Sequence, residues 1–325
     1  MKPWSFRKKF VVGLILIFVG AFGYRAWTEY KSSDDARLSK NEILNLEISG
    51  VIMNGKKFLA QLKKYSDDET VKAIVIDVNS PGGAVGPSQE LYYEIIRAKQ
   101  KTKKPIVCVS TGLMASGGYY AALACDKIVV APGAMIGSIG VIMEFANLER
   151  LYDWAKVQRY TITSGRFKDS GSEYRPMRDD ERQLFQDMIN EVYAQFRSTV
   201  AKARGLDIDF VSQYADGRVM TGAKAVQLKF ADVEGTFQDA VELAAKMAKL
   251  APDDYRIFKP HREKFSVFDL LSMSDDEDDD LNSVSQIRQT IFGTSSKGVA
   301  KEIMNGVLNT KYLNQPLYLM PGFRE

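Results

Sequence analysis

The stretch "PIVCVSTGLMASGGYYAALACDKIVVAP", residues 105–132, reads as a complete strand–turn–helix–strand unit. Its two ends, 105–110 and 127–132, are short apolar runs rich in Ile and Val, which is typical of buried parallel strands. Between them, the small residues and tyrosines of 116–125 predict a helix. Two buried strands separated by a helix indicate a parallel sheet with a right-handed crossover.

The same alternation continues on both sides of this unit. On the N-terminal side, "ILNLEIS" at 43–49 and "KAIVIDVN" at 72–79 predict two further strands. On the C-terminal side, another strand is predicted at 157–163. Helical patterns are expected at roughly 55–65, 87–103, 116–125, 179–204, from about 221, and over about 237–250. The sequence therefore predicts an α/β fold.

Composition excludes several classes of protein. The chain has 325 residues, 45% of them hydrophobic, with 44 basic and 41 acidic residues and a net charge of +3. No basic domain stands out, which argues against a nucleic-acid partner. Cys108 and Cys125 both lie in apolar runs, so we expect buried free thiols. Two cysteines and one histidine are too few ligands for a zinc site, and no metal is expected.

The N-terminus predicts export. Three cations at 7–9 precede the uncharged run 10–24. One interpretation is an uncleaved transmembrane anchor with the positive charge inside. The other is a signal peptide cleaved near 21–23, where small residues resemble a cleavage site. Arg25 follows that site closely, which favours the anchor, although both interpretations export the domain.

Shifts in composition divide the chain into five segments. The middle segments are the α/β region and, after it, a stretch that contains the acidic run "SDDEDDD" at 274–280. The expected organisation is an anchor or signal segment at 1–30, a linker at 31–42, a catalytic domain at 43–262, an acidic linker at 263–297, and a helix near 298–308 with an apolar tail to 325.

Three glycine-rich turns follow predicted strands, at 79–85, 112–118 and 132–141. The carboxyl ends of parallel strands meet at one edge of a sheet, so we expect these turns to converge. The first turn could be a phosphate cradle, but it lacks the lysine and the spacing of a P-loop. It could also pair with the second as an oxyanion hole, with N–H donors from Gly83 and Gly117, or be a plain strand-to-helix turn.

Ser116 stands in the second turn, where a helix begins. It could be a nucleophile on a tight turn, or simply the N-cap of that helix. His261 is the only histidine and lies in a charged stretch, so a Ser-His-Asp triad is disfavoured. Lys168 lies in a glycine- and serine-rich loop and is the alternative base. A lysine accepts a proton only when it is neutral, a state that burial favours.

Over residues 43–250 the sequence resembles signal peptide peptidase A, the membrane-anchored Ser-Lys peptidase of bacteria, in its short single-domain form. The resemblance rests on motifs that occur in the family's order: "IDVNSPGG", "MASGGYYAA", "IGSIGV", "SGRFKDSGSEYRPM" followed by "DDER", and "DGRVMTGAKAVQL". One departure is Glu173, which stands where family members often have proline.

The resemblance implies a role for each matching residue. Ser116 would be the nucleophile, Lys168 the general base, and Ser138 a serine that orients the lysine. Gly83 and Gly117 would donate to the oxyanion. The implied fold is the ββα superhelix of Clp protease and crotonase, preceded by a transmembrane helix, and no cofactor is implied.

The resemblance also implies a setting. The catalytic domain would lie outside the cytoplasm, on a single-pass anchor in the bacterial inner membrane. Its substrates would be remnant signal peptides and other short apolar segments, and its copies would form a homo-oligomeric ring. The alternatives are a stomatin-associated Ser-Lys membrane peptidase, a crotonase-like enzyme acting on acyl-coenzyme A, and a non-catalytic membrane scaffold.

Two smaller expectations concern residues beside the site. Asp169 is adjacent to Lys168 and would stabilise its charged form if the two paired, so we expect the carboxylate to point away. The tail "PLYLM" at 316–320 is apolar and extended, and resembles what such a peptidase would bind. It is expected either in or beside a binding groove, or as a packing strand.

Overall fold

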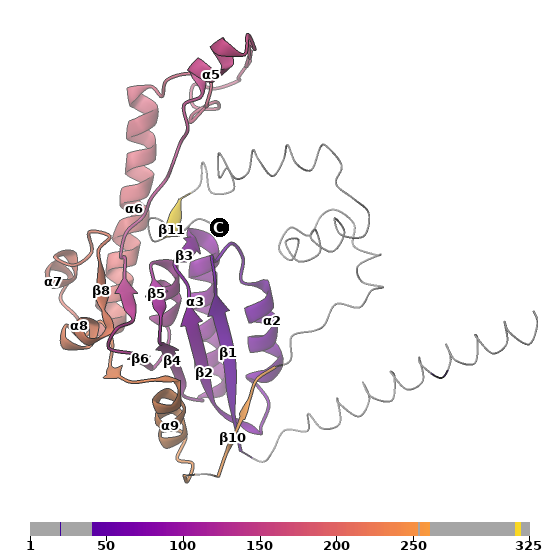
Figure 1. The fold of residues 1–325 in the computed structure, drawn as a ribbon, viewed down its shortest axis with the longest axis vertical. Helices are drawn as coiled ribbons and strands as arrows, with labels where there is room; N and C mark the ends of the chain where they lie inside the picture. The colour runs from indigo at the N-terminus through magenta and orange to yellow at the C-terminus, as the bar shows by residue number, and fades with distance from the viewer. Residues whose placement is uncertain (1–19, 21–40, 253, 261–315, 320–325) are drawn as a thin grey trace, which may run out of the picture.

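The computed structural model describes residues 20, 41–252, 254–260 and 316–319, and its centre is a six-stranded sheet (Figure 1). Neighbouring strands are parallel throughout, in the order β10-β1-β2-β4-β6-β9. The strands are β1 (Glu42–Ser49), β2 (Val71–Asn79), β4 (Ile106–Ser110), β6 (Lys127–Val130), β9 (Val233–Glu234) and β10 (Arg256–Phe258). The predicted α/β class and its four central strands are confirmed.

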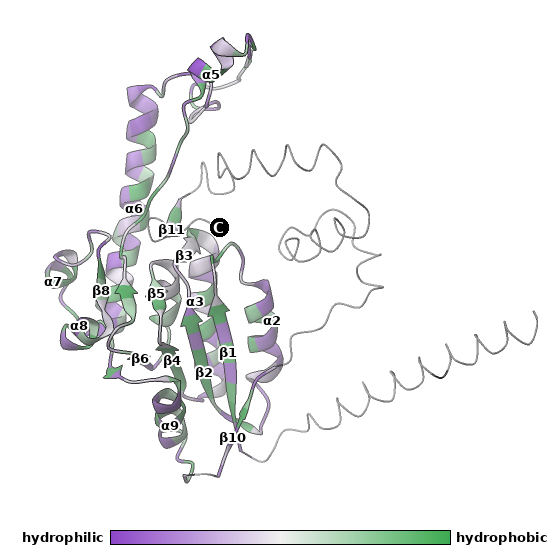
Figure 2. Ribbon diagram, in the orientation of Figure 1, coloured by the Kyte–Doolittle hydropathy of each residue, from purple (hydrophilic) through white to green (hydrophobic). Residues whose placement is uncertain are grey.

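Helices cover both faces of this sheet. The helices are α2 (Lys56–Tyr65), α3 (Val85–Thr102) and α4 (Gly117–Ala122) on one face and α9 (Phe237–Met247) on the other. Successive residues of a strand point to opposite faces, so Ile74 packs in the first layer and Val75 in the second. Both faces are therefore buried, which explains why the central strands are mostly apolar (Figure 2).

Two smaller sheets form inside the glycine-rich turns. One joins β5 (Leu113–Ala115), β7 (Met135–Gly137) and β8 (Val219–Thr221). The other joins β3 (Gly82–Ala84) to β11 (Leu317–Leu319) from the far end of the chain. Strands of three residues or fewer are too short to show a period, so the sequence did not predict them. Strands β5 and β7 join the second and third turns, and backbone bonds of Ser80 to Leu113 and Ala115 join the first turn to the second, so the three turns converge as expected.

An arm projects from this body (Figure 1). It consists of the segment 141–178, including α5 (Glu149–Trp154), and the N-terminal part of α6 (Asp179–Arg204). The C-terminal part of α6 packs on the body through the buried Phe196 and Val200. Two short helices, α7 (Ile208–Ser212) and α8 (Gly222–Gln227), follow it.

The prediction of a strand at 157–163 is wrong. These residues are irregular and exposed on the arm. A strand needs a partner to pair with its backbone N–H and C=O groups, and these residues pair with no other strand among those described. Their apolar residues are therefore not core positions of the sheet.

The expectation of two free thiols is also wrong. Cys108 in β4 and Cys125 just after α4 form a disulfide across a sequence separation of 17 residues. The helix folds back along the strand and leaves the two Cα atoms 5.8 Å apart, within the usual range for a disulfide. Spacing alone did not reveal this, because it depends on how α4 packs.

Several expectations fall outside the described residues. They include His261, the acidic run at 274–280, the helix near 298–308 and all of the candidate anchor 10–24 except Gly20. Within the described ranges, no helix combines the length and the apolarity needed to cross a membrane. The expected division of the chain into five segments stays a prediction.

Candidate active site

Ser116 lies between the end of β5 and the start of α4. Its backbone has φ 50° and ψ −116°, a conformation that is costly for a residue other than glycine. Two bonds hold it there: its N–H donates to the Gly137 carbonyl at 2.7 Å, and its carbonyl accepts from the Tyr120 N–H at 2.8 Å. Its hydroxyl caps no helix N–H, and it is buried without a hydrogen-bond partner among the described residues. This geometry favours the nucleophile over the N-cap interpretation.

Ser138 lies beside Ser116. Strands β5 and β7 are parallel with Ala115 opposite Gly137, so the two serines are the next residues beyond adjacent strand ends. Ser138 also has a positive φ, 51°, and its N–H donates to the Arg218 carbonyl at 2.8 Å. The sheet register therefore brings together two buried serines that are far apart in sequence.

Gly83 presents its N–H to this region. The flanking Gly82 carbonyl and Ala84 N–H both bond to Ile52, each at 2.8 Å. Backbone groups alternate in direction along a strand, so the N–H of Gly83 points the other way, toward Tyr318 of β11. The role of Gly83 as an oxyanion donor stays a prediction, and its N–H faces Tyr318 of the paired strand.

Gly117 supplies a second N–H at the same place. It is the first residue of α4, so its N–H has no acceptor within that helix. A Cβ placed on Gly82 would lie 2.6 Å from this nitrogen and 1.9 Å from the Tyr318 carbonyl oxygen. The Tyr318 carbonyl thus lies close to both proposed donors, and only glycine fits at position 82.

Strand β11 lies in the groove formed here. On one side it pairs antiparallel with β3, and on the other Leu317 and Ile142 exchange hydrogen bonds of 2.9 and 3.1 Å. The Tyr318 side chain is fully buried, stacks on Tyr120 at 5.1 Å and donates to the Val192 carbonyl at 3.2 Å. Burial raises the pKa of Tyr318. The tail thus pairs with β3 of its own chain, which both expectations, a segment bound in a groove and a packing strand, allow.

Neither the pocket around the Tyr318 ring nor the bridge from Leu317 to Ile142 could be predicted from the residues that form them. The pocket joins Tyr120, Phe196 and Val192 from α4 and α6, which are far apart in sequence. Only the apolar character of the tail indicated that something would bind here.

Lys168 is not part of this group. It lies in the arm, its side chain is exposed, and its ammonium makes no hydrogen bond or ion pair within the described ranges. Its loop is tied to the start of α6, where Arg178 donates to the Arg166 carbonyl at 2.8 Å. Helix α6 reaches α4 only near Phe196, roughly 25 Å farther along at about 1.5 Å per residue. One chain therefore brings Ser116 to Ser138 and the two glycines, but not to Lys168.

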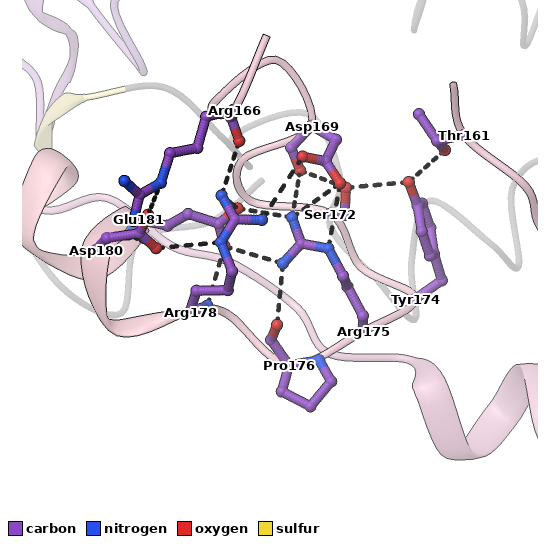
Figure 3. Close-up of polar contacts among 10 residues, drawn as sticks. All are labelled: Thr161, Arg166, Asp169, Ser172, Tyr174, Arg175, Pro176, Arg178, Asp180 and Glu181. Atoms are coloured by element: carbon purple, nitrogen blue, oxygen red, sulfur yellow. Dashed lines mark hydrogen bonds and ion pairs between the residues drawn. The ribbon is translucent and has the colours of Figure 1, made fainter. Parts of the chain in front are cut away.

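Two neighbours of Lys168 have partners of their own. Asp169, which was expected to point away from Lys168, pairs with Arg175 at 2.9 Å (Figure 3). Glu173, the residue in place of proline, pairs with Arg159 at 3.0 Å and accepts from the Tyr152 hydroxyl. The departure from the family motif therefore links the Lys168 loop to the segment that contains α5.

Comparison with known proteins identifies the family of this chain. The family model described as peptidase family S49 matches residues 98–251. A Synechocystis sp. protein named protease slr0021 is 37% identical over 216 residues, which cover 66% of this chain and 77% of that protein. The chain belongs to peptidase family S49, and is a protease of the type that includes signal peptide peptidase SppA.

Two other relatives show how far the similarity extends. An Enterococcus faecium protein named as signal peptide peptidase SppA is 34% identical over 225 residues, covering 65% of each chain. Protease 4 of Salmonella typhi is 32% identical over 211 residues, which cover 62% of this chain and 34% of that protein. The match thus spans just under two thirds of the first relative and about a third of the second.

Proposed function

We propose that the protein is a membrane-anchored serine endopeptidase in which Ser116 is the nucleophile and Lys168 the general base. The observation that carries this proposal is the Ser116 hydroxyl, buried without a described partner on a turn held at positive φ. Such a hydroxyl has no structural role that explains its strained position. The experiment is labelling with an active-site serine probe, which should modify wild-type protein but not Ser116→Ala. Labelling that survives in the variant would contradict the proposal.

The proposed chemistry is acyl transfer. Neutral Lys168 takes the proton of the Ser116 hydroxyl while the serine oxygen bonds to a substrate carbonyl carbon. The carbonyl oxygen becomes an oxyanion that accepts from the N–H groups of Gly83 and Gly117. The lysine ammonium then protonates the leaving amine as the peptide bond breaks. A water molecule, deprotonated by the same lysine, releases the acyl group and regenerates Ser116.

The tail supports the assignment of the donors. The Tyr318 carbonyl of β11 lies beside both proposed N–H donors, where the scissile carbonyl of an extended peptide would lie. Losing one such donor costs about 3–4 kcal/mol of transition-state stabilisation in a comparable enzyme. Antiparallel addition of a strand is also a common way for proteins to bind extended peptides.

We further propose that each site is completed by Lys168 from a second copy of the chain. Two observations support this: the Lys168 loop is tied to the start of α6, which lies roughly 20 Å by helix rise from Val192, where α6 contacts the body, and the arm exposes an apolar set that a neighbour could cover. The exposed apolar residues of the arm are Leu151, Trp154, Val157, Tyr160, Ile162 and Phe167. Repeated around a closed ring, this contact would complete every site.

Mixing two inactive variants tests this arrangement directly. Ser116→Ala and Lys168→Ala proteins, dissociated and reassembled together, should regain activity, because some intact serines then meet intact lysines. Random mixing around a ring predicts up to about one quarter of wild-type activity. If the lysine of the same chain served each serine, no mixture would recover activity. A mixture of Ser116→Ala with itself is the matched control.

The proposal also extends to the fold family of the domain and to its location in the cell. We assign the body to the Clp protease and crotonase superhelix, with 1–30 as a membrane anchor and the catalytic domain outside the cytoplasm. A disulfide between Cys108 and Cys125 is typical of oxidising compartments and supports export. The apolar β11 in the groove supports substrates that are short apolar segments, such as signal peptide remnants.

A further inference from the structure

A balanced group of charges surrounds the Lys168 loop (Figure 3). At its centre is Glu181 in the first turn of α6, whose side chain is 0% exposed. Arg175 donates to both carboxylate oxygens of Glu181, at 2.6 and 2.9 Å, and Arg178 pairs with the same carboxylate at 2.9 Å. These arginines hold the pKa of Glu181 down to about 2 against the opposing effect of burial.

The same two arginines hold the loop on both sides of Lys168. Before the lysine, Arg178 donates to the Arg166 carbonyl at 2.8 Å. After it, Arg175 donates to the Asp169 carbonyl at 3.1 Å and to its carboxylate at 3.2 Å. The backbone on either side of Lys168 is therefore fixed to a buried carboxylate through two guanidinium groups.

Lys168 is the exception among the cations of this region. Arg166 pairs with Asp180 at 2.7 Å, and Arg175 and Arg178 pair with Asp169, Asp180 and Glu181. Three guanidinium groups thus match three carboxylates. Among these four cations of the described loop and its flank, Arg166, Lys168, Arg175 and Arg178, only the Lys168 ammonium has no carboxylate partner, although Asp169 is its neighbour in sequence.

We propose that Arg175 is a positioning residue: by binding Asp169 and Glu181 it fixes the Lys168 loop and keeps the Asp169 carboxylate from pairing with the lysine. The inference rests on the proposed role of Lys168 as the base. An ammonium paired with a carboxylate keeps its proton and cannot accept that of a serine. Arg175 therefore keeps the base in a usable protonation state, without touching the substrate.

Asp169 interacts with three titratable groups of the segment that follows its loop: it pairs with Arg175 and Arg178, and its charge acts on the Tyr174 hydroxyl. Asp180 and Glu181 of α6 share these arginines with it, and Arg166 pairs with Asp180. Arg175 makes the shortest ion pair with Asp169. Its loss frees that carboxylate more than the loss of any other cation here.

The test is the pH profile of kcat/KM on a neutral apolar peptide, measured with the full chain in detergent. In Arg175→Gln the freed Asp169 pairs with Lys168, so the midpoint of the rise should move up by roughly one pH unit. At pH 7 this lowers kcat/KM about tenfold. The double variant Arg175→Gln/Asp169→Asn should return the midpoint to the wild-type value. A shift that persists in the double variant would overturn the inference.

A second variant keeps the test decisive if Arg175→Gln fails to fold. In Asp169→Asn the midpoint should stay where it is, whatever happens to kcat, because Arg175 already holds that carboxylate. A midpoint that falls in Asp169→Asn would show that Asp169 pairs with Lys168 in the working enzyme, which contradicts the inference.

Arg204→Gln is the matched control. It breaks another arginine–aspartate pair of α6, Arg204 with Asp232 at 2.8 Å, away from the Lys168 loop. It should lower the melting temperature without moving the midpoint. Lys168→Ala distinguishes a failure of the proposed function from a failure of the positioning role of Arg175. If that variant is active, the proposed function fails; if it is inactive and Arg175→Gln does not move the midpoint, only the positioning inference fails.

Discussion

The nucleophile region and the arm are built by different forces. Ser116, Ser138 and the two donor glycines lie at strand ends in the apolar interior, placed by sheet register and packing. Lys168 lies on an arm with little core of its own, fixed mainly by ion pairs with Glu181 at their centre. Packing makes the first region rigid, while charge pairs allow the second to extend away from its own body. This difference supports the proposal that one chain carries two half-sites rather than one complete site.

The largest effect should follow from removing either half of the proposed dyad. Ser116→Ala and Lys168→Ala should each lower kcat/KM at least about a thousandfold, and the double variant should be little worse, because the two groups act as a unit. Peptide hydrolysis measures this loss, and circular dichroism should show that both variants stay folded. Lys168→Arg should be equally inactive because a guanidinium keeps its proton. Substantial activity in Lys168→Ala would leave the arm without a catalytic role.

Truncating a residue where the arm meets the body should show the different stability of the two regions. Phe196 is fully buried against Tyr120 and Tyr318, so Phe196→Ala should destabilise the fold by about 3–5 kcal/mol. Trp154 on the arm is 79% exposed, so Trp154→Ala should leave the melting temperature of the single chain nearly unchanged. Thermal unfolding measures both. Sedimentation should show that Trp154→Ala weakens assembly, and an unchanged oligomer would argue against the arm as the interface.

The fold was largely predictable because its signals are local. Strands buried on both faces, such as 72–79, read as continuous apolar runs, and the long helix at 179–204 opens on acids and ends before a glycine. The convergence of the three turns followed from the rule that parallel strand ends share an edge. The short strands within those turns and the disulfide were not predictable, because both depend on tertiary packing.

The candidate site was predictable to a different degree in its two halves. Motifs and topology together indicated that Ser116, Ser138, Gly83 and Gly117 would lie together, and the described geometry has them together. The same motifs predicted Lys168 as a site residue but did not predict its distance from Ser116. That distance depends on how far α6 extends beyond its contact at Phe196, which a local pattern does not encode.

A smaller loss should follow from removing Ser138, which lies beside the nucleophile and is proposed to orient the incoming lysine. Ser138→Ala should lower kcat by roughly ten- to a hundredfold, less than loss of the dyad, because the serine transfers no proton in the mechanism. Its positive φ of 51° is retained by the backbone bond to Arg218. Steady-state kinetics would test this, and a loss as large as that of Ser116→Ala would give Ser138 a direct role.

Deleting the tail should act in the opposite direction. Strand β11 fills the groove between β3 and Ile142, so removing residues 313–325 should raise the rate on short apolar peptides several-fold by removing an internal competitor. The added peptide PLYLM should then inhibit the truncated protein more than the full chain. A truncated protein that unfolds would favour the alternative, in which β11 is a packing strand. Tyr318→Ala offers a milder test, because it removes the buried ring and keeps the strand.

The smallest effect concerns the stability of the arm in acid. It distinguishes the pH dependence of the arm's structure from the pH dependence of catalysis. The pKa of Glu181 is lowered to about 2 by Arg175 and Arg178, so its ion pairs stabilise the fold fully above the unfolded value of about 4.5. That contribution is lost only as the pH falls toward 2. Between pH 8 and pH 5 the arm should therefore keep its hydrogen-exchange protection, whatever happens to activity in that range. His261→Ala should leave this profile unchanged. Protection lost in parallel with activity in that range would mean that the arm, rather than the base, responds to acid.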